Sequence, residues 1–243
     1  MENLNLKYKI ISAISSSDIS SYLIKKHYYD WQRPLRQVEI ACYYSHRKIW
    51  SIVAKGDAPA LILEDDAILA NDLKNSLQFL ENLKGVDYIN LESVNRKKLL
   101  GRKPTYSFGE ISLYSLHIDK NGACGYILYP TGAKKLIDRE KYGIGLADVY
   151  INDCPKLKAY QLEPASAIQT IVAHRFNIKS PIAVNTNIGN IKKPQIQSLD
   201  YFVFKPKRVY AQAKNIAKLL FHIFKSRYRI VSVDRDKFTK GNK

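Results

Sequence analysis

Three adjacent carboxylates, Glu64, Asp65 and Asp66, interrupt an apolar stretch of this chain. They directly follow the run 61–63, Leu-Ile-Leu, which begins two residues after Pro59. The run is too short for a solvent-facing helix and lacks polar alternation, so it predicts a fully buried parallel strand. Burial contributes roughly 1.5–3 kcal/mol per leucine or isoleucine, whereas clustered carboxylates oppose burial unless a cation or a donor compensates them. We therefore expect the carboxylates at the carboxyl end of the strand, where open α/β sheets bind ligands.

The positive charge of the chain is large and uneven. The 243 residues carry a formal net charge of +17, and 46% of them are hydrophobic, which is typical of a globular protein. From Lys205 to the end there are 12 Lys and Arg against Asp234 and Asp236, a net of +10 that leaves +7 for the first 204 residues. The length predicts one domain with an appendage, at residues 1–200 and 201–243. The basic appendage indicates an acidic partner.

The cysteines and the apolar runs bear on the compartment. Cys42, Cys124 and Cys154 are far apart, lack the spacing of metal ligands and are odd in number, so they predict a reduced, cytosolic environment rather than a disulfide framework. No signal-like run begins the sequence, and no stretch of about 18 apolar residues occurs. We expect a cytoplasmic protein that does not span a membrane.

Apolar periodicity and turn residues divide the chain into alternating strands and helices. The spacing between the strand at 61–63 and the next one is that of a β-α-β crossover, which predicts parallel neighbours. The basic run 96–103 predicts a loop, either solvated or gripping phosphates. In chain order we expect a strand at 9–14, helices at 34–55 and 71–83, strands at 87–91, 111–117 and 123–129, a helix at 130–139, a segment at 144–152, an edge strand with Pro164 at 160–171, and irregular chain at 181–194.

The helix at 34–55 has a regular pattern of spacings of three and four. These spacings predict its buried side at Val38, Cys42, Ser45, Ile49 and Val53. His46 lies beside this stripe, where it either makes hydrogen bonds within the core or contacts a phosphate or a sugar.

The helix expected at 206–227 is amphipathic with basic flanks. Its apolar stripe includes Val209, Ile216, Leu220 and Phe224. Such a helix either docks on its own domain or lies on an anionic membrane leaflet, where each basic residue contributes about 1 kcal/mol. The aromatic residues and the number of cations favour the membrane.

The acidic triplet has the chemistry of a cation site. Alternate side chains of a strand share a face, so Glu64 and Asp66 converge, and a turn beginning at Asp65 brings all three together. Oxygen ligands without His or Cys select Mg²⁺ or Mn²⁺, which completes its coordination with water and substrate phosphates. This indicates a diphosphate-bearing substrate. Acidic residues at a strand end also serve as helix caps or solvated turns, and that alternative stays open.

Several motifs in one order resemble those of a known family. Residues 39–50, which include Ser45 and His46, are followed by 60–69 with the acidic triplet, by 122–128 and 132–136, by Asp148-Val149-Tyr150, and by 160–164 with Gln169. This series closely resembles glycosyltransferase family 25, the lipooligosaccharide galactosyltransferases of Gram-negative bacteria and their relatives. The resemblance covers roughly residues 8 to 170.

The resemblance implies a fold, a reaction and a site. The fold would be an α/β, GT-A-like domain with a mostly parallel central sheet flanked by helices. The reaction would be an inverting transfer, of galactose in particular, from a UDP-sugar to a sugar hydroxyl. Glu64, Asp65 and Asp66 would hold the diphosphate and its Mn²⁺ or Mg²⁺, and Ser45 and His46 would line the donor cleft. Asp148 is the first candidate for the general base that inversion needs, although a helix cap explains it equally well, and Glu163 is the second.

The same resemblance implies a location and partners. The acceptor would be a lipid-linked oligosaccharide, and the basic tail would face the anionic inner leaflet of the bacterial inner membrane. Nucleic acid is not expected, because the basic residues concentrate in a tail and do not interleave with aromatics in a recognised module. A glycosidase is disfavoured because its two carboxyls face each other across a sugar, whereas these three are adjacent.

One departure from the family supports an alternative. Family members usually begin with a strand and an Arg-rich turn before the segment that corresponds to residues 9–14, and this sequence has no counterpart. Val38 and Ala41 also stand where the family tends to have glycine. The alternative is a catalytically silent, glycosyltransferase-like binding protein.

Overall fold

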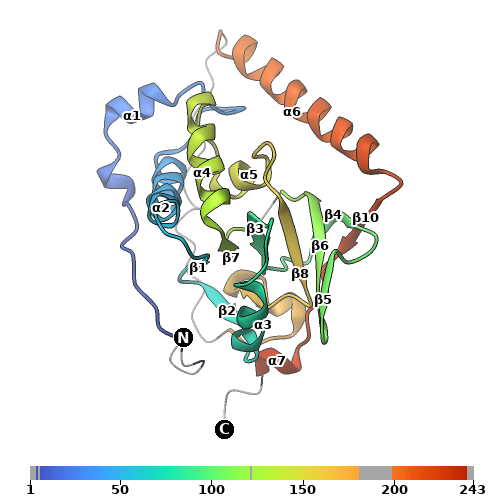
Figure 1. Ribbon diagram of the computed structural model, residues 1–243. Coiled ribbons are helices and arrows are strands. Elements are labelled where there is room, and N and C mark those ends of the chain that lie inside the picture. The colour runs from blue at the N-terminus through green and yellow to red at the C-terminus, as the bar shows by residue number, and fades with distance from the viewer. Residues whose placement is uncertain (1–3, 5, 121, 181–198, 240–243) are drawn as a thin grey trace.

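The computed structural model describes residues 4, 6–120, 122–180 and 199–239, and within them a central sheet is flanked by helices (Figure 1). The α-helices are α1 (Ser21–Lys26), α2 (Gln37–Val53), α3 (Leu73–Leu80), α4 (Pro130–Asp138), α5 (Ala147–Asn152), α6 (Tyr201–His222) and α7 (Asp236–Thr239). The strands are β1 (Ala60–Leu63), β2 (Ala67–Leu69), β3 (Tyr88–Asn90), β4 (Lys97–Gly101), β5 (Tyr106–Phe108), β6 (Ile111–Ile118), β7 (Gly125–Leu128), β8 (Ala159–Glu163), β9 (Ala167–Gln169) and β10 (Ser226–Ile230).

The main sheet is mostly antiparallel, so the expectation of a mostly parallel sheet was wrong. Its strands lie in the order β1-β7-β3-β8-β6-β4-β10, with β5 paired to β6, while β2 and β9 form a separate ribbon. Among the described strand pairs, β3 with β8 is the parallel one. The prediction of a mixed α/β fold with helices around a central sheet is confirmed.

The insertion of β7 explains the error. β1 and β3 run in the same direction, as the crossover spacing predicts, but β7 lies between them and pairs antiparallel with both. β1 is therefore an edge strand, and the prediction of a fully buried parallel strand at 61–63 was wrong. Ile62 is buried, whereas Leu61 and Leu63 are half-buried.

Three other segments differ from the sequence prediction. Residues 9–14 form no strand and pair with none of the described strands, and Ile10 is 81% exposed. The run 96–103 is not a loop, since it contains β4, whose Lys98 is buried. The segment 160–171 is not one edge strand: β8 lies inside the sheet, Pro164 ends it, and β9 follows.

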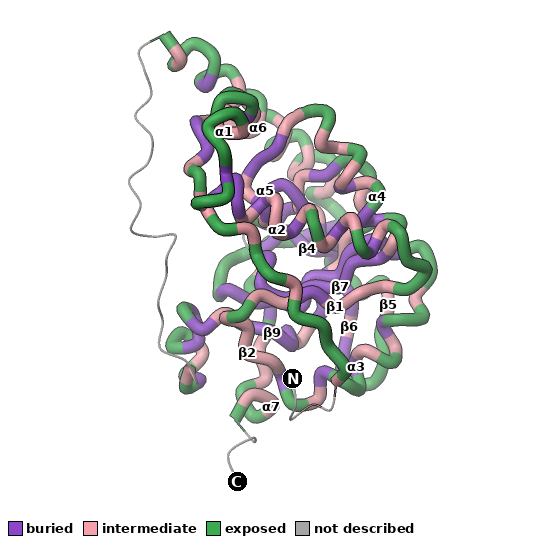
Figure 2. Tube along the Cα trace, turned by 90° about the vertical axis from the view of Figure 1, so that its left-hand side faces the viewer, coloured by how far each residue is buried: buried purple, intermediate pink, exposed green. Residues whose placement is uncertain are grey.

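Alternation along the strands gives the sheet two apolar faces. Tyr88 and Tyr126 belong to the cluster packed against α2, α4 and α5, while Ile89 and Ile127 belong to the cluster packed against α3. The burial along the chain follows this layering (Figure 2). α4 packs closely on the sheet: a Cβ at Gly132 would lie 2.2 Å from the backbone oxygen of Asp87, the residue just before β3.

The helix expected at 34–55 is confirmed as α2, but of its predicted buried side only Val53 is fully buried, while Val38, Cys42, Ser45 and Ile49 are half-buried. The residues that point into the core include Tyr43, His46, Trp50 and Val53. Trp50 stacks on Tyr150 at 5.6 Å between ring centroids, with 10° between the ring planes. The aromatic side chains bury more apolar area than Val38 or Ile49 would, and they set the rotation of the helix.

The C-terminal segment returns to the sheet. α6 lies across the top of the molecule, and β10 then pairs with β4 at the sheet edge opposite β1 (Figure 1). The helix spans 201–222 rather than 206–227, and the division of the chain at residue 200 stays a prediction. The irregular segment expected at 181–194 lies outside the described residues. Within the described chain, none of the helices has the length and apolar character needed to cross a bilayer.

Candidate active site

Carboxylates from four separate segments gather beside the ends of β1 and β3. Glu64, Asp65 and Asp66 follow β1, Glu92 follows β3, Asp119 follows β6, and Asp148 lies in the first turn of α5. They act on one another electrostatically, because Glu64 raises the pKa of Asp66, of Glu92 and of Asp148. The structure therefore assembles more negative charge than the triplet alone supplies.

Asp66 has the clearest need for a cation. Burial raises its pKa to about 6, and the neighbouring carboxylates of Glu64 and Asp65 add to the shift. Its Oδ1 is buried, and within the described residues it finds no hydrogen-bond partner. A buried carboxylate oxygen without a partner is costly, and a bound cation would satisfy it.

Glu92 is fully buried beside the triplet. Burial raises its pKa to about 8 despite the opposing ammonium of Lys98, and Glu64 and Asp119 raise it further. Its Oε2 accepts the backbone N–H of Cys124 at 3.2 Å, while its Oε1 has no partner among the described residues. Gly122, at a φ of +105°, lets the chain pass over this carboxylate, because a Cβ there would lie 2.8 Å from Oε2.

Asp119 is compensated, unlike Asp66. Its Oδ2 lies 2.8 Å from the Nζ of the buried Lys98 and accepts a hydrogen bond from Asn90 Nδ2 at 3.1 Å. The same ammonium donates to Gln161 Oε1 at 2.7 Å. This buried network pairs the ammonium of Lys98 with the carboxylate of Asp119 and satisfies both through hydrogen bonds.

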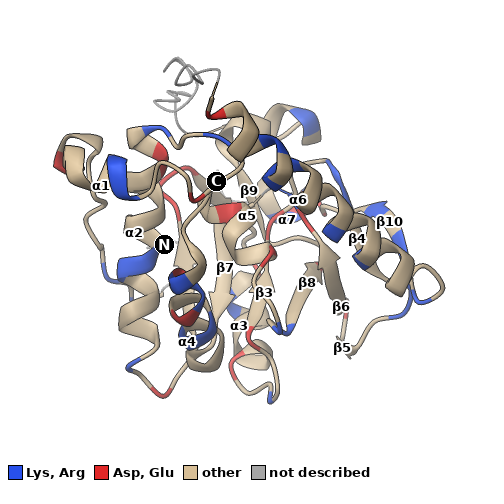
Figure 3. Cartoon of the chain, turned by 90° about the horizontal axis from the view of Figure 1, so that it is seen from above, with Lys and Arg blue, Asp and Glu red and all other residues tan. Residues whose placement is uncertain are grey.

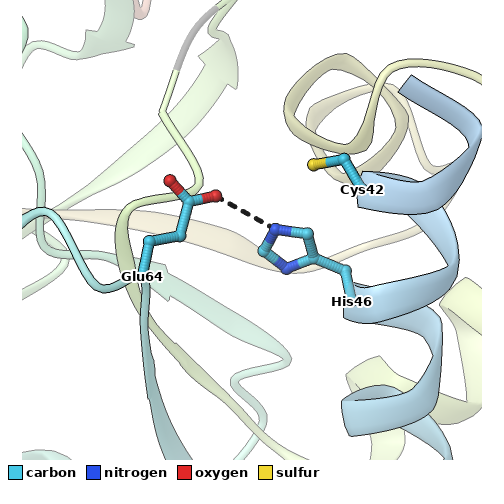
Figure 4. A group of neighbouring side chains, drawn as sticks. All are labelled: Cys42, His46 and Glu64. Carbon is cyan, nitrogen blue, oxygen red and sulfur yellow. Dashed lines mark hydrogen bonds and ion pairs between the residues drawn. The ribbon is translucent and has the colours of Figure 1, made fainter. Parts of the chain in front are cut away.

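His46 connects α2 to the acidic triplet (Figure 4). Its Nε2 lies 3.1 Å from Glu64 Oε1, and its Nδ1 lies 2.9 Å from the hydroxyl of Tyr126, which also accepts the indole N–H of Trp50 at 3.0 Å. Burial disfavours the imidazolium, but contacts with Tyr126, Cys42 and Glu64 favour it and raise the pKa of His46 above its ordinary value. A carboxylate only accepts, so Nε2 donates to Glu64 in either state.

Two overlapping sets of side chains could hold a metal ion. The all-oxygen set Glu64, Asp65 and Asp66 suits Mg²⁺ or Mn²⁺. Cys42 Sγ, His46 and Glu64 form the second set, with ligand atoms within 4.8 Å of one another, and its sulfur and nitrogen suit Zn²⁺ better. Glu64 is common to both sets, so an ion in one set would compete with an ion in the other for this carboxylate.

Asp148 lies close enough to the triplet to sense its charge. Burial raises its pKa to about 6, opposed by the backbone N–H of Val149, which donates to Oδ1 at 2.7 Å, while Asp119 and Glu64 raise it further. Asp148 is not the cap considered from the sequence, because the N-cap of α5 is Leu146, but its bond to the N–H of Val149 satisfies one backbone group of the first helical turn. The raised pKa agrees with a base that works near neutral pH.

The structure places Ser45 and Glu163 in structural contacts. Ser45 Oγ accepts the backbone N–H of Ile14 at 2.8 Å and donates to Ala41 O at 2.9 Å. Glu163 pairs with Arg229 of β10 and accepts the backbone N–H of Ser232 at 3.0 Å. Both side chains thus join distant parts of the chain, whereas Glu64, Asp65, Asp66, Asp148 and His46 lie in one region.

Sequence reasoning missed several residues of this region. Glu92 follows a predicted strand, as Glu64 does, and the same argument applied to 87–91 would have found it. Asp119 stood in a turn-rich segment without any distinguishing pattern. Lys98 lies in the basic run that the sequence predicts to be a loop, either solvated or gripping phosphates, and Tyr126 lies within a predicted strand. Only the packing of α2 on β7 brings the hydroxyl of Tyr126 to His46.

The family comparison agrees with the motifs. A model of glycosyltransferase family 25, described as an LPS biosynthesis protein, matches residues 1–151. A protein of Haemophilus influenzae named "Putative glycosyltransferase" is 24% identical over 184 residues, which are 71% of this chain and 64% of that protein. This chain therefore matches less than two thirds of the length of that relative. The family match includes the triplet, Glu92, Asp119 and Asp148, and it ends before Glu163.

Proposed function

The chain belongs to glycosyltransferase family 25, and from that premise we propose that it transfers a sugar from a UDP-sugar, galactose in particular, to a lipooligosaccharide acceptor with inversion. The observation that carries the proposal is the buried Oδ1 of Asp66, which lacks a partner among the described residues and lies beside two further carboxylates. A nucleoside-diphosphate donor arrives with a divalent cation that such a site would hold.

The carboxylate ligands of the triplet fit Mn²⁺ or Mg²⁺. Glu64, Asp65 and Asp66 would hold the ion together with the diphosphate, whose charge it neutralises as the UDP leaves. Asp65 is exposed and accessible to the substrate, whereas Asp66 is half-buried and rigidly placed, because its backbone oxygen accepts the N–H of Thr170 at 3.0 Å. His46 holds Glu64 by its Nε2 and orients the first carboxylate of the set.

The acceptor side would be served by Asp148. Inversion requires one carboxylate to take the proton of the acceptor hydroxyl as that oxygen attacks the sugar carbon opposite the leaving UDP. A pKa near 6 leaves Asp148 ionised at neutral pH and still basic enough to accept the proton. Glu163 is less suited, since Arg229 and Ser232 already occupy its oxygens.

The test is a donor screen that measures UDP release. The purified chain is stripped of metal with a chelator and offered a panel of UDP-sugars with a sugar acceptor, with and without added Mn²⁺. We expect acceptor-dependent UDP release that requires the metal and is lost in Asp66→Asn. Asp57→Asn, which changes an exposed acid elsewhere, should leave the rate unchanged.

The same samples separate catalysis from silent binding. Calorimetric titration with UDP and Mn²⁺ reports binding independently of turnover. Binding without release by any donor would overturn the transferase and support the silent binding protein. If the chain neither binds UDP nor releases it from any donor, both the transferase and the silent binding protein are overturned.

A further inference from the structure

Helix α6 is fastened to the domain by one face. Phe204 is 1% exposed and stacks on Tyr29 at 5.7 Å between ring centroids. The hydroxyls of Tyr28 and Tyr29 donate to the two carboxylate oxygens of Asp200, just before the helix, at 2.7 and 2.8 Å. The N-terminal end of α6 is therefore held by specific contacts from the α1 region.

The same inner face reaches the candidate site. Lys214 Nζ lies 2.8 Å from Asp153 Oδ2, and Lys218 Nζ lies 3.1 Å from Oδ1 of the same carboxylate. A small cavity of about 40 Å³ lies under the helix, and its walls include Ala211, Asn215 and Lys218 of α6 together with Asp119, Val149 and Asn152. α6 thus forms part of the wall beside Asp119, next to the helix that carries Asp148.

The opposite face of α6 is apolar and uncovered by the described chain. Its large side chains recur at helical spacing, and all of them are between 55% and 86% exposed: Phe202, Val209, Tyr210, Ile216, Leu220, Phe221 and, just past the helix, Phe224. We call these seven residues the outer face. An exposed apolar stripe along a whole helix is typical of a docking surface rather than of free solvent contact.

All charged side chains on α6 are positive. The 22 residues of α6 include no Asp or Glu. Lys205 is exposed at the border of the outer face, and Lys225 and Arg227 are exposed at its C-terminal end. Figure 3 shows further Lys and Arg near β4 and β10, beside that end of the helix. A partner for this surface must therefore offer both an apolar region into which side chains can insert and negative charge beside it.

We propose that the outer face of α6 binds an anionic lipid surface. Phenylalanine and leucine side chains enter the acyl boundary, while the basic residues beside them meet the lipid phosphates, which is the usual arrangement of an interfacial amphipathic helix. A second copy of the chain is a poorer partner, because pairing two such faces would bring two positive borders together. The proposal does not depend on the proposed enzymatic activity.

Docking in this way would set the site close to the membrane. A helix with its side chains is about 10 Å across, so the cavity on the inner face of α6 would lie about that far from the lipid surface. Under the proposed function, an acceptor sugar attached to a lipid would approach the domain from the side that carries α6. Membrane binding can nevertheless be measured with no donor or acceptor present.

The test is sedimentation of the full chain with vesicles. One preparation is pure phosphatidylcholine, and the other contains about one-third phosphatidylglycerol. We expect binding to the anionic vesicles that weakens with added salt, and a loss of about tenfold in partitioning for the double variant Phe221→Ser/Phe224→Ser. The matched control is Ile10→Ser/Tyr142→Ser, which removes two residues that are 81% and 78% exposed elsewhere and should bind like the unmodified chain.

Four outcomes would overturn the proposal. They are no binding to anionic vesicles, equal binding to neutral and anionic vesicles, unchanged binding of the outer-face variant, and an equal loss in the control. Light scattering of the same samples measures the oligomeric state and so tests whether a second copy of the chain covers the outer face. A dimer that the outer-face substitutions dissociate, without any vesicle binding, would assign the face to self-association instead. Circular dichroism confirms that each variant is folded.

Discussion

The imidazole of His46 lies 3.1 Å from Glu64 Oε1, so a buried residue of α2 holds the first carboxylate of a triplet that follows β1. Behind the ring, the hydroxyl of Tyr126 lies 2.9 Å from Nδ1 and accepts the indole N–H of Trp50. The orientation of Glu64 is thus set by a chain of contacts that begins in the core. Such supporting contacts commonly determine how well a ligand side chain performs.

The first prediction concerns this support. His46→Leu should raise the Mn²⁺ concentration needed for half-maximal activity by about 10–100-fold, because Glu64 loses its orienting donor. His46→Gln keeps an N–H that can reach Glu64 and should recover part of that loss. Metal titrations of both variants provide the measurement. If the two variants lose metal affinity equally while both stay folded, His46 has only a packing role.

The second prediction concerns stability without metal. Asp66 is forced to ionise in a half-buried site beside Glu64 and Asp65, so Asp66→Asn should stabilise the metal-free protein by about 1–2 kcal/mol at pH 7, after allowance for solvent screening. The same variant should lose metal-dependent turnover. Thermal melts with a chelator measure the gain, and a lower melting temperature for Asp66→Asn would contradict it.

The pH dependence of stability follows from the same group. The pKa of Asp66 is raised in the folded protein to about 6 from an ordinary value of 3.8, so folding favours the protonated form. The contribution of this group to stability is greatest below its unfolded pKa and declines as the pH rises from about 4 to about 6. Asp66→Asn should therefore flatten the melting-temperature profile across this interval. A difference between variant and parent that does not change with pH would contradict the assignment.

The third prediction separates the two candidate bases. Asp148→Asn should lower kcat by about 10²–10⁴-fold while leaving the binding of UDP and Mn²⁺ intact, because it removes the proton acceptor and not the donor site. The rate of the parent enzyme should also fall as the pH drops below about 6, where Asp148 becomes protonated. A normal kcat in Asp148→Asn would eliminate it as the base.

Glu163→Gln is the matched comparison for Asp148→Asn. It breaks a largely buried ion pair with Arg229, so we expect the free energy of unfolding to fall by about 1–3 kcal/mol and kcat to stay close to that of the parent. Steady-state kinetics and thermal melts on the two variants should thus give opposite patterns. A large loss of kcat in Glu163→Gln alone would transfer the role to Glu163.

The fourth prediction uses the second set of ligands. Zn²⁺ at Cys42, His46 and Glu64 would withdraw Glu64 from the all-oxygen set, so Zn²⁺ should inhibit turnover in the presence of Mn²⁺. Cys42→Ser weakens this set without touching the triplet, and it should reduce the inhibition by about tenfold. Inhibition curves for both proteins test this, and identical curves would count against a zinc site there.

The sequence was informative where periodicity and chemistry coincide locally. The helices at 34–55, 71–83 and 130–139 and the strands at 87–91, 111–117 and 123–129 are all present as α2, α3, α4, β3, β6 and β7. The clustering of the triplet at a strand end, and the proximity of Asp148, also follow from motif order. These features depend on residues that are close in sequence or on a series of motifs in a known order.

The sequence could not show how the strands are arranged. A β-α-β spacing sets the direction of β1 and β3 correctly, but nothing in either segment indicates that β7 enters between them. Lys98 illustrates the same limit, because a lysine in a basic run becomes buried only through its contacts with Asp119 and Gln161, which are distant in sequence. The roles of Glu92 and Tyr126 likewise depend on contacts between separate segments.

The position of β7 has a consequence for the order in which the molecule can be assembled. β1 and β3 emerge from the ribosome well before residues 125–128, yet each needs β7 as its antiparallel neighbour. Glu64, Asp66 and Glu92 therefore stay on unpaired segments until the chain is synthesised past residue 128. Contacts of this sequence separation are slow to form, so we expect the carboxylates that follow β1 and β3 to come together only as β7 pairs with both strands.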